Sequence, residues 1–138
     1  MAASLRPASL RPAPRPSPAD LARLAAACCA DNKANDVVLL DLAPVTDMTD
    51  FFVIASGTSD THVRSTAQHV MDAMREAGHA VYHVEGLSQG RWVLLDYVDF
   101  VVHLFHPTLR TFYQLERLWS DATVMPVPAS VASQGASR

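Results

Sequence analysis

The chain has 138 residues, of which 49% are apolar and 18% are charged. This length fits one domain with a buried core, and no apolar run approaches the roughly 18 residues that span a bilayer. The formal charge is −3, but setting aside the terminal arginines (6, 11, 15 and 138) leaves −7 for residues 20–121. Such an acidic core repels a phosphate backbone and suits a basic protein surface, so we expect no membrane and no direct sequence-specific nucleic-acid partner.

Residues 1–19 differ from the rest of the chain in composition. They repeat the sequence SLRPA and carry five of the nine prolines, which predicts a disordered Pro/Arg-rich leader. The leader has no apolar segment of the secretory type. Its arginines and serines leave organelle import open as a minor alternative to a cytoplasmic location. Residues 123–138 are expected to form a disordered tail, so residues 20–122 form the predicted domain.

Helical and strand patterns alternate between residues 20 and 122. Asp20 is expected to cap the first helix, and Gly78 to end the second. The predicted fold class is α/β: a single domain with a mixed five-stranded sheet and flanking helices, in the order αββαβββα. Helices are expected at about 21–31, 60–77 and 107–119, and strands at 37–42, 51–55, 81–84, 92–96 and 100–105.

Charged and aromatic side chains interrupt the apolar hairpin at residues 92–105. With Tyr97 and Val98 as a two-residue turn, the pairs would be Asp96 with Asp99, Leu94 with Val101, and Trp92 with His103. Because side chains alternate along a strand, these six would share one face. The face is either a half-covered sheet with solvated turn acids or a partner surface, since two facing carboxylates favour a basic partner.

Enzymatic alternatives receive little support from spacing. Asp96 and Asp99 lie across a turn with no third ligand nearby, and His103 and His106 point to opposite faces of a strand, so no metal site is expected. The loop Ser56–Ser59 could hold an anion on backbone N–H groups, but a glycine turn with a hydroxyl helix cap is the simpler interpretation. No catalytic residues and no cofactor are predicted.

Several segments resemble the ribosomal silencing factor family, also called Iojap-related (RsfS). They are KANDVVLLDL, TDFFVIASGTS, VEG, WVLLDYVDFVVHLF and RTFYQLERLWSDA, in the family's order. The resemblance implies a non-enzymatic translation repressor with a nucleotidyltransferase-like fold. Members bind the large ribosomal subunit through ribosomal protein fourteen and block joining of the small subunit, which lowers translation when nutrients are scarce.

On this resemblance, the hairpin face becomes the expected docking site. Its predicted partner-binding residues are Trp92, Leu94, Asp96, Asp99, Val101, His103 and Glu85. The family usually has glycine in the hairpin turn where this chain has Val98, and a valine with positive φ would be strained. A vestigial nucleotidyltransferase and a homodimeric adaptor remain alternatives, and a homodimer is also compatible with silencing.

Overall fold

The computed structural model describes residues 17–44, 46–109 and 122–127. Its elements follow the predicted order through the fifth strand and then add a sixth. They are α1 (Pro18–Asp31), β1 (Asn35–Asp41), β2 (Phe51–Ser56), α2 (Asp60–Glu76), β3 (His83–Glu85), β4 (Trp92–Asp96), β5 (Phe100–Phe105) and β6 (Thr123–Met125).

Helix α1 begins earlier than expected, inside the predicted leader. Ser17 is the N-cap rather than Asp20: its Oγ accepts from the Asp20 N–H at 3.1 Å, and the Asp20 carboxylate accepts from the Ser17 N–H at 3.3 Å. This reciprocal pair is a capping box, and Pro18 fits the first helical position because its missing N–H would have no helical partner there. The prediction of Asp20 as the cap was therefore wrong by three residues.

The strands form one mixed sheet in the order β3-β4-β5-β2-β1-β6. Only β2 and β5 run parallel, and every other neighbouring pair is antiparallel. The sixth strand corrects the prediction of five: Thr123–Met125, expected in the disordered tail, pair with β1. Three residues are too few to show a period, so only the neighbouring strand reveals them.

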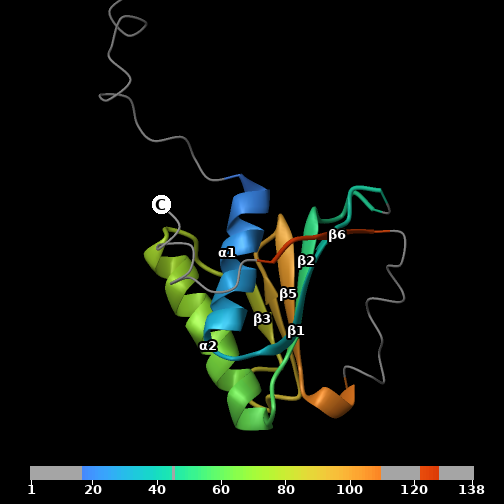
Figure 1. Cartoon of the computed structure of the whole chain (residues 1–138). Helices are drawn as coiled ribbons and strands as arrows, with labels where there is room; N and C mark the ends of the chain where they lie inside the picture. The colour runs from blue at the N-terminus through green and yellow to red at the C-terminus, as the bar shows by residue number, and fades with distance from the viewer. Residues whose placement is uncertain (1–16, 45, 110–121, 128–138) are drawn as a thin grey trace, which may run out of the picture.

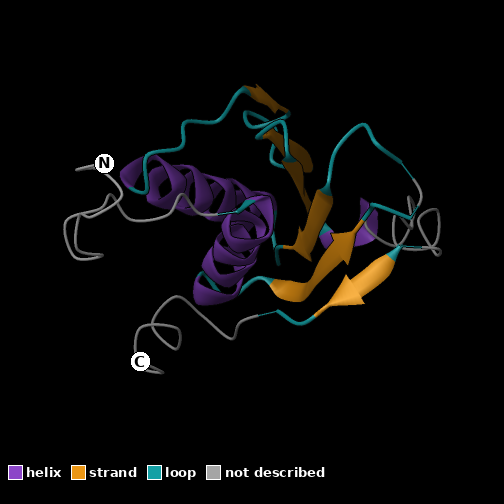
Figure 2. Cartoon of the chain, turned by 90° about the horizontal axis from the view of Figure 1, so that it is seen from above, coloured by secondary structure: helices purple, strands orange, loops and turns teal. Residues whose placement is uncertain are grey.

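Helices α1 and α2 pack on the same face of the sheet (Figures 1 and 2). α1 contacts β1, β2 and β5, while α2 contacts β4, β5 and α1. Small residues of α1, including the free cysteines Cys28 and Cys29, are fully buried in this main core. Burial raises the pKa of the Cys28 thiol to about 11 and that of Cys29 still further, so both act as small apolar core residues.

The opposite face of the sheet carries a smaller apolar cluster. Leu40, Leu42, Ile54 and Phe105 are its buried members, with Trp92 among the residues packed around them. Residues 107–109 form a helical turn beyond β5, and the rest of the helix predicted at 107–119 lies outside the described residues. None of the described helices has the length and apolar character needed to cross a membrane.

Candidate functional site

The hairpin of β4 and β5 is offset from the predicted pairing. Asp96 faces Val101, Leu94 faces His103, and Trp92 faces Phe105. The predicted pairs were wrong because the turn lies one residue later than expected: Val98 and Asp99 are its central residues, and the Tyr97 N–H donates to the Phe100 carbonyl at 2.9 Å. An offset of two leaves each strand residue on its original face, so the predicted face itself is preserved.

Val98 adopts the left-handed conformation, which the sequence analysis expected to be strained for a valine. Its φ is +72°, and the Asp99 N–H donates to the Tyr97 carbonyl at 2.8 Å across it, which makes a strained γ-turn. Two contacts hold the turn. The Val98 N–H donates to Asp96 Oδ1 at 2.7 Å, and Thr49 Oγ1 donates to the Val98 carbonyl at 3.0 Å.

The corrected turn separates the two carboxylates. Asp96 lies on the open face of the sheet, whereas Asp99 lines a different hollow with Leu21 of α1 and Gly78 at the end of α2. The like-charge pair on which the docking prediction partly depended is therefore absent. Asp96 remains as the hairpin carboxylate on the predicted face.

An open pocket of about 590 Å³ lies on this face. Four of the seven predicted site residues line it: Leu94, Asp96, Val101 and His103. Its other lining residues come from β2, the β1–β2 loop, the segment before β3 and the hairpin turn; they are Thr46, Met48, Thr49, Phe52, Tyr82 and Val98. We call this hollow the sheet pocket.

His103 lies at the base of the sheet pocket and is only 5% exposed. Burial lowers its pKa from 6.5 to about 4, so the ring is neutral at pH 7. Trp92 Nε1 donates to His103 Nδ1 at 3.2 Å, and this bond assigns the ring proton to Nε2. In the described part of the chain, Nε2 is buried and has no hydrogen-bond partner.

Trp92 and Glu85 lie beside the sheet pocket and do not line it. The Trp92 ring is half-buried against Phe105, with centroids 5.2 Å apart, and its N–H orients His103. Glu85 is exposed on β3 opposite Leu94, and its Oε2 lies 2.9 Å from Nε2 of His83. Trp92 thus affects the sheet pocket by orienting His103, and Glu85 belongs to the neighbouring surface.

The acidic residues near the sheet pocket make its surroundings negatively charged. Asp96 is in the lining, and Asp47 and Asp50 lie on the adjoining β1–β2 loop. No lysine or arginine is found among the described lining residues, and His103 is neutral. An apolar surface with a negative border favours an apolar partner surface flanked by basic side chains.

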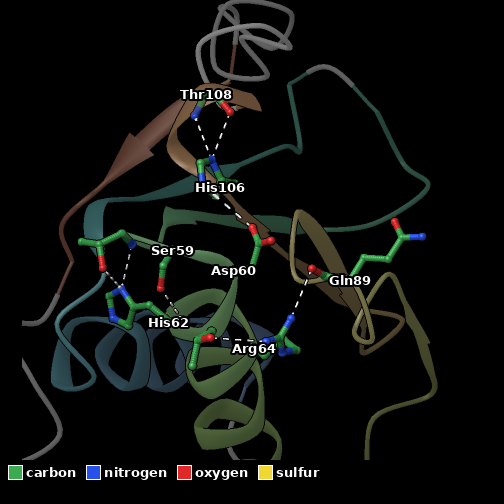
Figure 3. Close-up of polar contacts among 9 residues, drawn as sticks. Ser59, Asp60, His62, Arg64, Gln89, His106 and Thr108 are labelled. Atoms are coloured by element: carbon green, nitrogen blue, oxygen red, sulfur yellow. Dashed lines mark hydrogen bonds and ion pairs between the residues drawn. The ribbon is translucent and has the colours of Figure 1, made fainter.

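The loop Ser56–Ser59 forms a helix cap, as the simpler interpretation held. Ser59 Oγ accepts from the His62 N–H at 3.1 Å, and the Thr58 N–H donates to His62 Nδ1 at 2.9 Å (Figure 3). Two of the backbone donors that an anion would need here are already used, because the Gly57 N–H donates to the Phe105 carbonyl and the Thr58 N–H to His62. Asp60 also places a carboxylate in the first turn of α2, which disfavours an anion there.

His106 belongs to this polar cluster and not to the sheet pocket. Its Nε2 lies 3.9 Å from Asp60 Oδ1, while Arg64 Nη1 donates to the Gln89 carbonyl at 3.3 Å and so links α2 to the β3–β4 loop (Figure 3). His103 and His106 therefore occupy separate environments. Among the residues that the structure describes, no three His, Cys, Asp or Glu side chains lie close enough to hold a metal ion.

The family model described as "Ribosomal silencing factor during starvation" matches residues 14–138. The chain belongs to the ribosomal silencing factor family. It is 42% identical over 100 residues to the ribosomal silencing factor RsfS of Bacillus subtilis, which covers 72% of this chain and 85% of that protein. It is also 33% identical over 104 residues to the chloroplastic protein Iojap of Arabidopsis thaliana, across 75% of this chain and 43% of that protein.

A solved structure shares the fold of this silencing-factor domain. A crystal structure of a Chromobacterium violaceum protein superposes with a TM-score of 0.73 at 30% identity, covering 83% of this chain and 92% of that one. The predicted family and the mixed α/β class are both confirmed.

Six described residues that line the sheet pocket were not predicted as site residues, and three of them are large apolar or aromatic residues: Phe52, Met48 and Tyr82. Phe52 lies in a strand interpreted as buried on both faces, and only its pairing with β5 places it beside Val101. Met48 is 88% exposed and Tyr82 76% exposed. Met48 could have been found from the sequence, because it is a large apolar residue within the polar loop Thr46–Thr49. No comparable sequence signal indicated Tyr82.

Proposed function

We propose that this protein silences translation by binding the large ribosomal subunit through ribosomal protein fourteen. The bound domain would occupy space that the small subunit needs, and so lower translation when nutrients are limiting. The observation that carries the proposal is the match of residues 14–138 to a family named for silencing of ribosomes during starvation. The bacterial relatives support action in the cytoplasm.

The geometry supports a docking role that needs no catalytic step. The sheet pocket offers an apolar floor in Leu94 and Val101, a carboxylate in Asp96 and an exposed aromatic in Tyr82. Binding energy at protein interfaces concentrates in such apolar centres within a polar border, where one truncation costs about 2–4 kcal/mol. A steric repressor needs only this affinity and its own volume.

Sedimentation tests the proposal directly. The full chain is mixed with ribosomal subunits separated at low Mg²⁺ and resolved on a sucrose gradient. We expect it to migrate with the large subunit and not with the small one. A chain that remains at the top of the gradient, or that follows the small subunit, contradicts the proposal.

Two charge-removing variants test the location of the interface. Asp96→Asn keeps an oxygen for the Val98 N–H and removes the charge beside the sheet pocket, whereas Asp99→Asn removes a charge outside it. We expect Asp96→Asn to weaken large-subunit binding several-fold at low salt, because a border charge acts mainly on association. Asp99→Asn should bind like wild type. An equal loss from both variants contradicts this placement.

A further inference from the structure

His103 lines the sheet pocket and carries a buried polar atom, Nε2, that has no hydrogen-bond partner among the described residues. We infer that the sheet pocket receives one apolar side chain of a protein partner, and that a neutral carbonyl next to that side chain accepts a hydrogen bond from His103 Nε2. The inference rests on the proposed function and deepens it, because it states what the silencing factor recognises on its partner.

The proton on Nε2 follows from the contact on the other side of the ring. Nδ1 accepts from Trp92 Nε1 at 3.2 Å, so the neutral ring carries its proton on Nε2. Phe52 packs edge-on against the ring, with centroids 4.6 Å apart, and fixes its plane. Nε2 is thus a buried, oriented donor without a partner in the described part of the chain.

A buried donor left without a partner is unfavourable in the free protein. Such a group destabilises a fold, and most buried polar groups are therefore paired. His103 is a lining residue of the sheet pocket, whose floor is apolar, and its Nε2 is buried in the free protein. An acceptor supplied by a bound partner would remove the unfavourable term only in the complex, which makes the His103 N–H a determinant of recognition.

Charge decides between a carbonyl and an anion as the acceptor. His103 is neutral, and its surroundings oppose a positive charge. Asp96, in the lining of the same pocket, would repel a carboxylate or a phosphate. A backbone or amide carbonyl accepts from a neutral N–H without either cost, and its adjoining apolar side chain fits against Leu94 and Val101.

The border of the sheet pocket indicates a protein partner. Met48, Tyr82 and Val98 are 88%, 76% and 57% exposed, so apolar surface continues outward beyond the hollow. Asp47 and Asp96 add negative charge beside it. A protein segment with an apolar side chain next to lysine or arginine matches both features. A second copy of this chain, whose core carries −7, would instead bring like charge.

His103→Leu tests the inference, because leucine fills a similar volume without the N–H. In the full chain we expect at least a tenfold loss of affinity for purified large subunits. The urea midpoint of unfolding should stay close to that of wild type, because the variant removes an unpaired buried donor but also the acceptor of the Trp92 Nε1–H. His69→Leu is the control: it removes a histidine bound to Asp31 on the helix layer and should keep full affinity.

A second variant keeps the test decisive if His103→Leu folds poorly. Val101→Phe extends a half-buried side chain into the sheet pocket and should exclude the occupant, again with at least a tenfold loss. Wild-type binding with undiminished binding of both variants overturns the inference and leaves the proposed function standing. Absence of wild-type binding overturns the proposed function. If the variants change only self-association in analytical ultracentrifugation, the occupant is a second copy and the inference is wrong.

Discussion

At the scale of single residues, Val98 shows how hydrogen bonds stabilise a strained turn. A β-branched residue at φ +72° is destabilising by roughly 1–2 kcal/mol relative to an unstrained backbone. The surrounding hydrogen bonds from Thr49 and to Asp96 hold it in place. Its side chain forms part of the border of the sheet pocket, so the same position affects both stability and surface.

Val98→Gly should stabilise the protein. Glycine adopts positive φ without a Cβ clash, which removes the strain. Its greater conformational entropy in the unfolded chain offsets part of this gain, so we expect a net increase of about 1 kcal/mol in the free energy of unfolding. Thermal and urea unfolding measure it. Val98→Ala is the control, because it shortens the exposed side chain and keeps the strain. A glycine variant no more stable than the alanine variant contradicts the strain argument.

His103 makes stability depend on pH in a stated direction. Its pKa is about 4 in the folded chain and near 6.5 when unfolded, so the unfolded state binds the proton more readily between these values. Wild type should therefore lose stability as the pH falls through this window, by on the order of 3 kcal/mol near pH 4. Above pH 6.5 the effect disappears.

Comparison with His103→Leu isolates this contribution, because the two proteins differ in sequence only at this titratable group. Urea unfolding from pH 7 to pH 4 should show a smaller loss of stability in the leucine variant. Parallel pH profiles for the two proteins would show that His103 does not titrate as stated.

At the scale of elements, the ends of helices and strands were harder to predict than their existence. α2 ends where Gly78 predicted, because Gly78 adopts φ +93° and its N–H donates to the Arg75 carbonyl. α1 began earlier than predicted because Ser17 provides a better cap than Asp20. The spacing of Ser17 and Asp20 fits a capping box and so indicated the start of α1. The proline-rich composition around Ser17 instead favoured disorder there.

Ser17→Ala should destabilise the protein by about 1 kcal/mol, since it removes the acceptor of the Asp20 N–H. Urea unfolding measures the change, and circular dichroism should show fraying confined to the start of α1. Ser88→Ala, in the exposed β3–β4 loop, is the control and should be neutral. Equal stability of the two variants would show that the capping box contributes little.

At the scale of the whole molecule, the two faces of the sheet differ in what covers them. α1 and α2 cover one face of the sheet (Figure 2) and build the main core. The sheet pocket lies on the other face. On the proposed function, this asymmetry would let a small domain present one apolar surface to its partner without weakening its core. Repression by steric exclusion would then depend on that face alone.

A subunit-joining experiment tests this division. Wild-type protein added to purified subunits before the Mg²⁺ concentration is raised should reduce the joined-ribosome peak on a gradient. Leu94→Lys places a positive charge on the floor of the sheet pocket and should abolish the reduction. Val124→Lys makes the same kind of change at the opposite edge of the sheet, on exposed β6, and should act like wild type. Equal activity of the two variants contradicts the proposed face.

The sequence by itself determined the family, the order of most elements and the face of each residue within the hairpin strands β4 and β5. These follow from local signals: segment composition, the 3.6- and 2-residue periods, and the alternation of side chains along a strand. The alternation survives an offset of two, which is why Leu94, Val101 and His103 were placed on the correct face despite the wrong pairing.

Only the tertiary structure decided the composition of the sheet pocket. Parallel pairing of β2 with β5 brings Phe52 beside Val101, and chain folding brings Met48 and Tyr82 to the border, across separations that no local pattern records. The turn at Val98 moved Asp99 away, because turn geometry depends on contacts with Thr49 and Asp50 from a distant loop. The environment of His103 likewise exists only once the strands have paired.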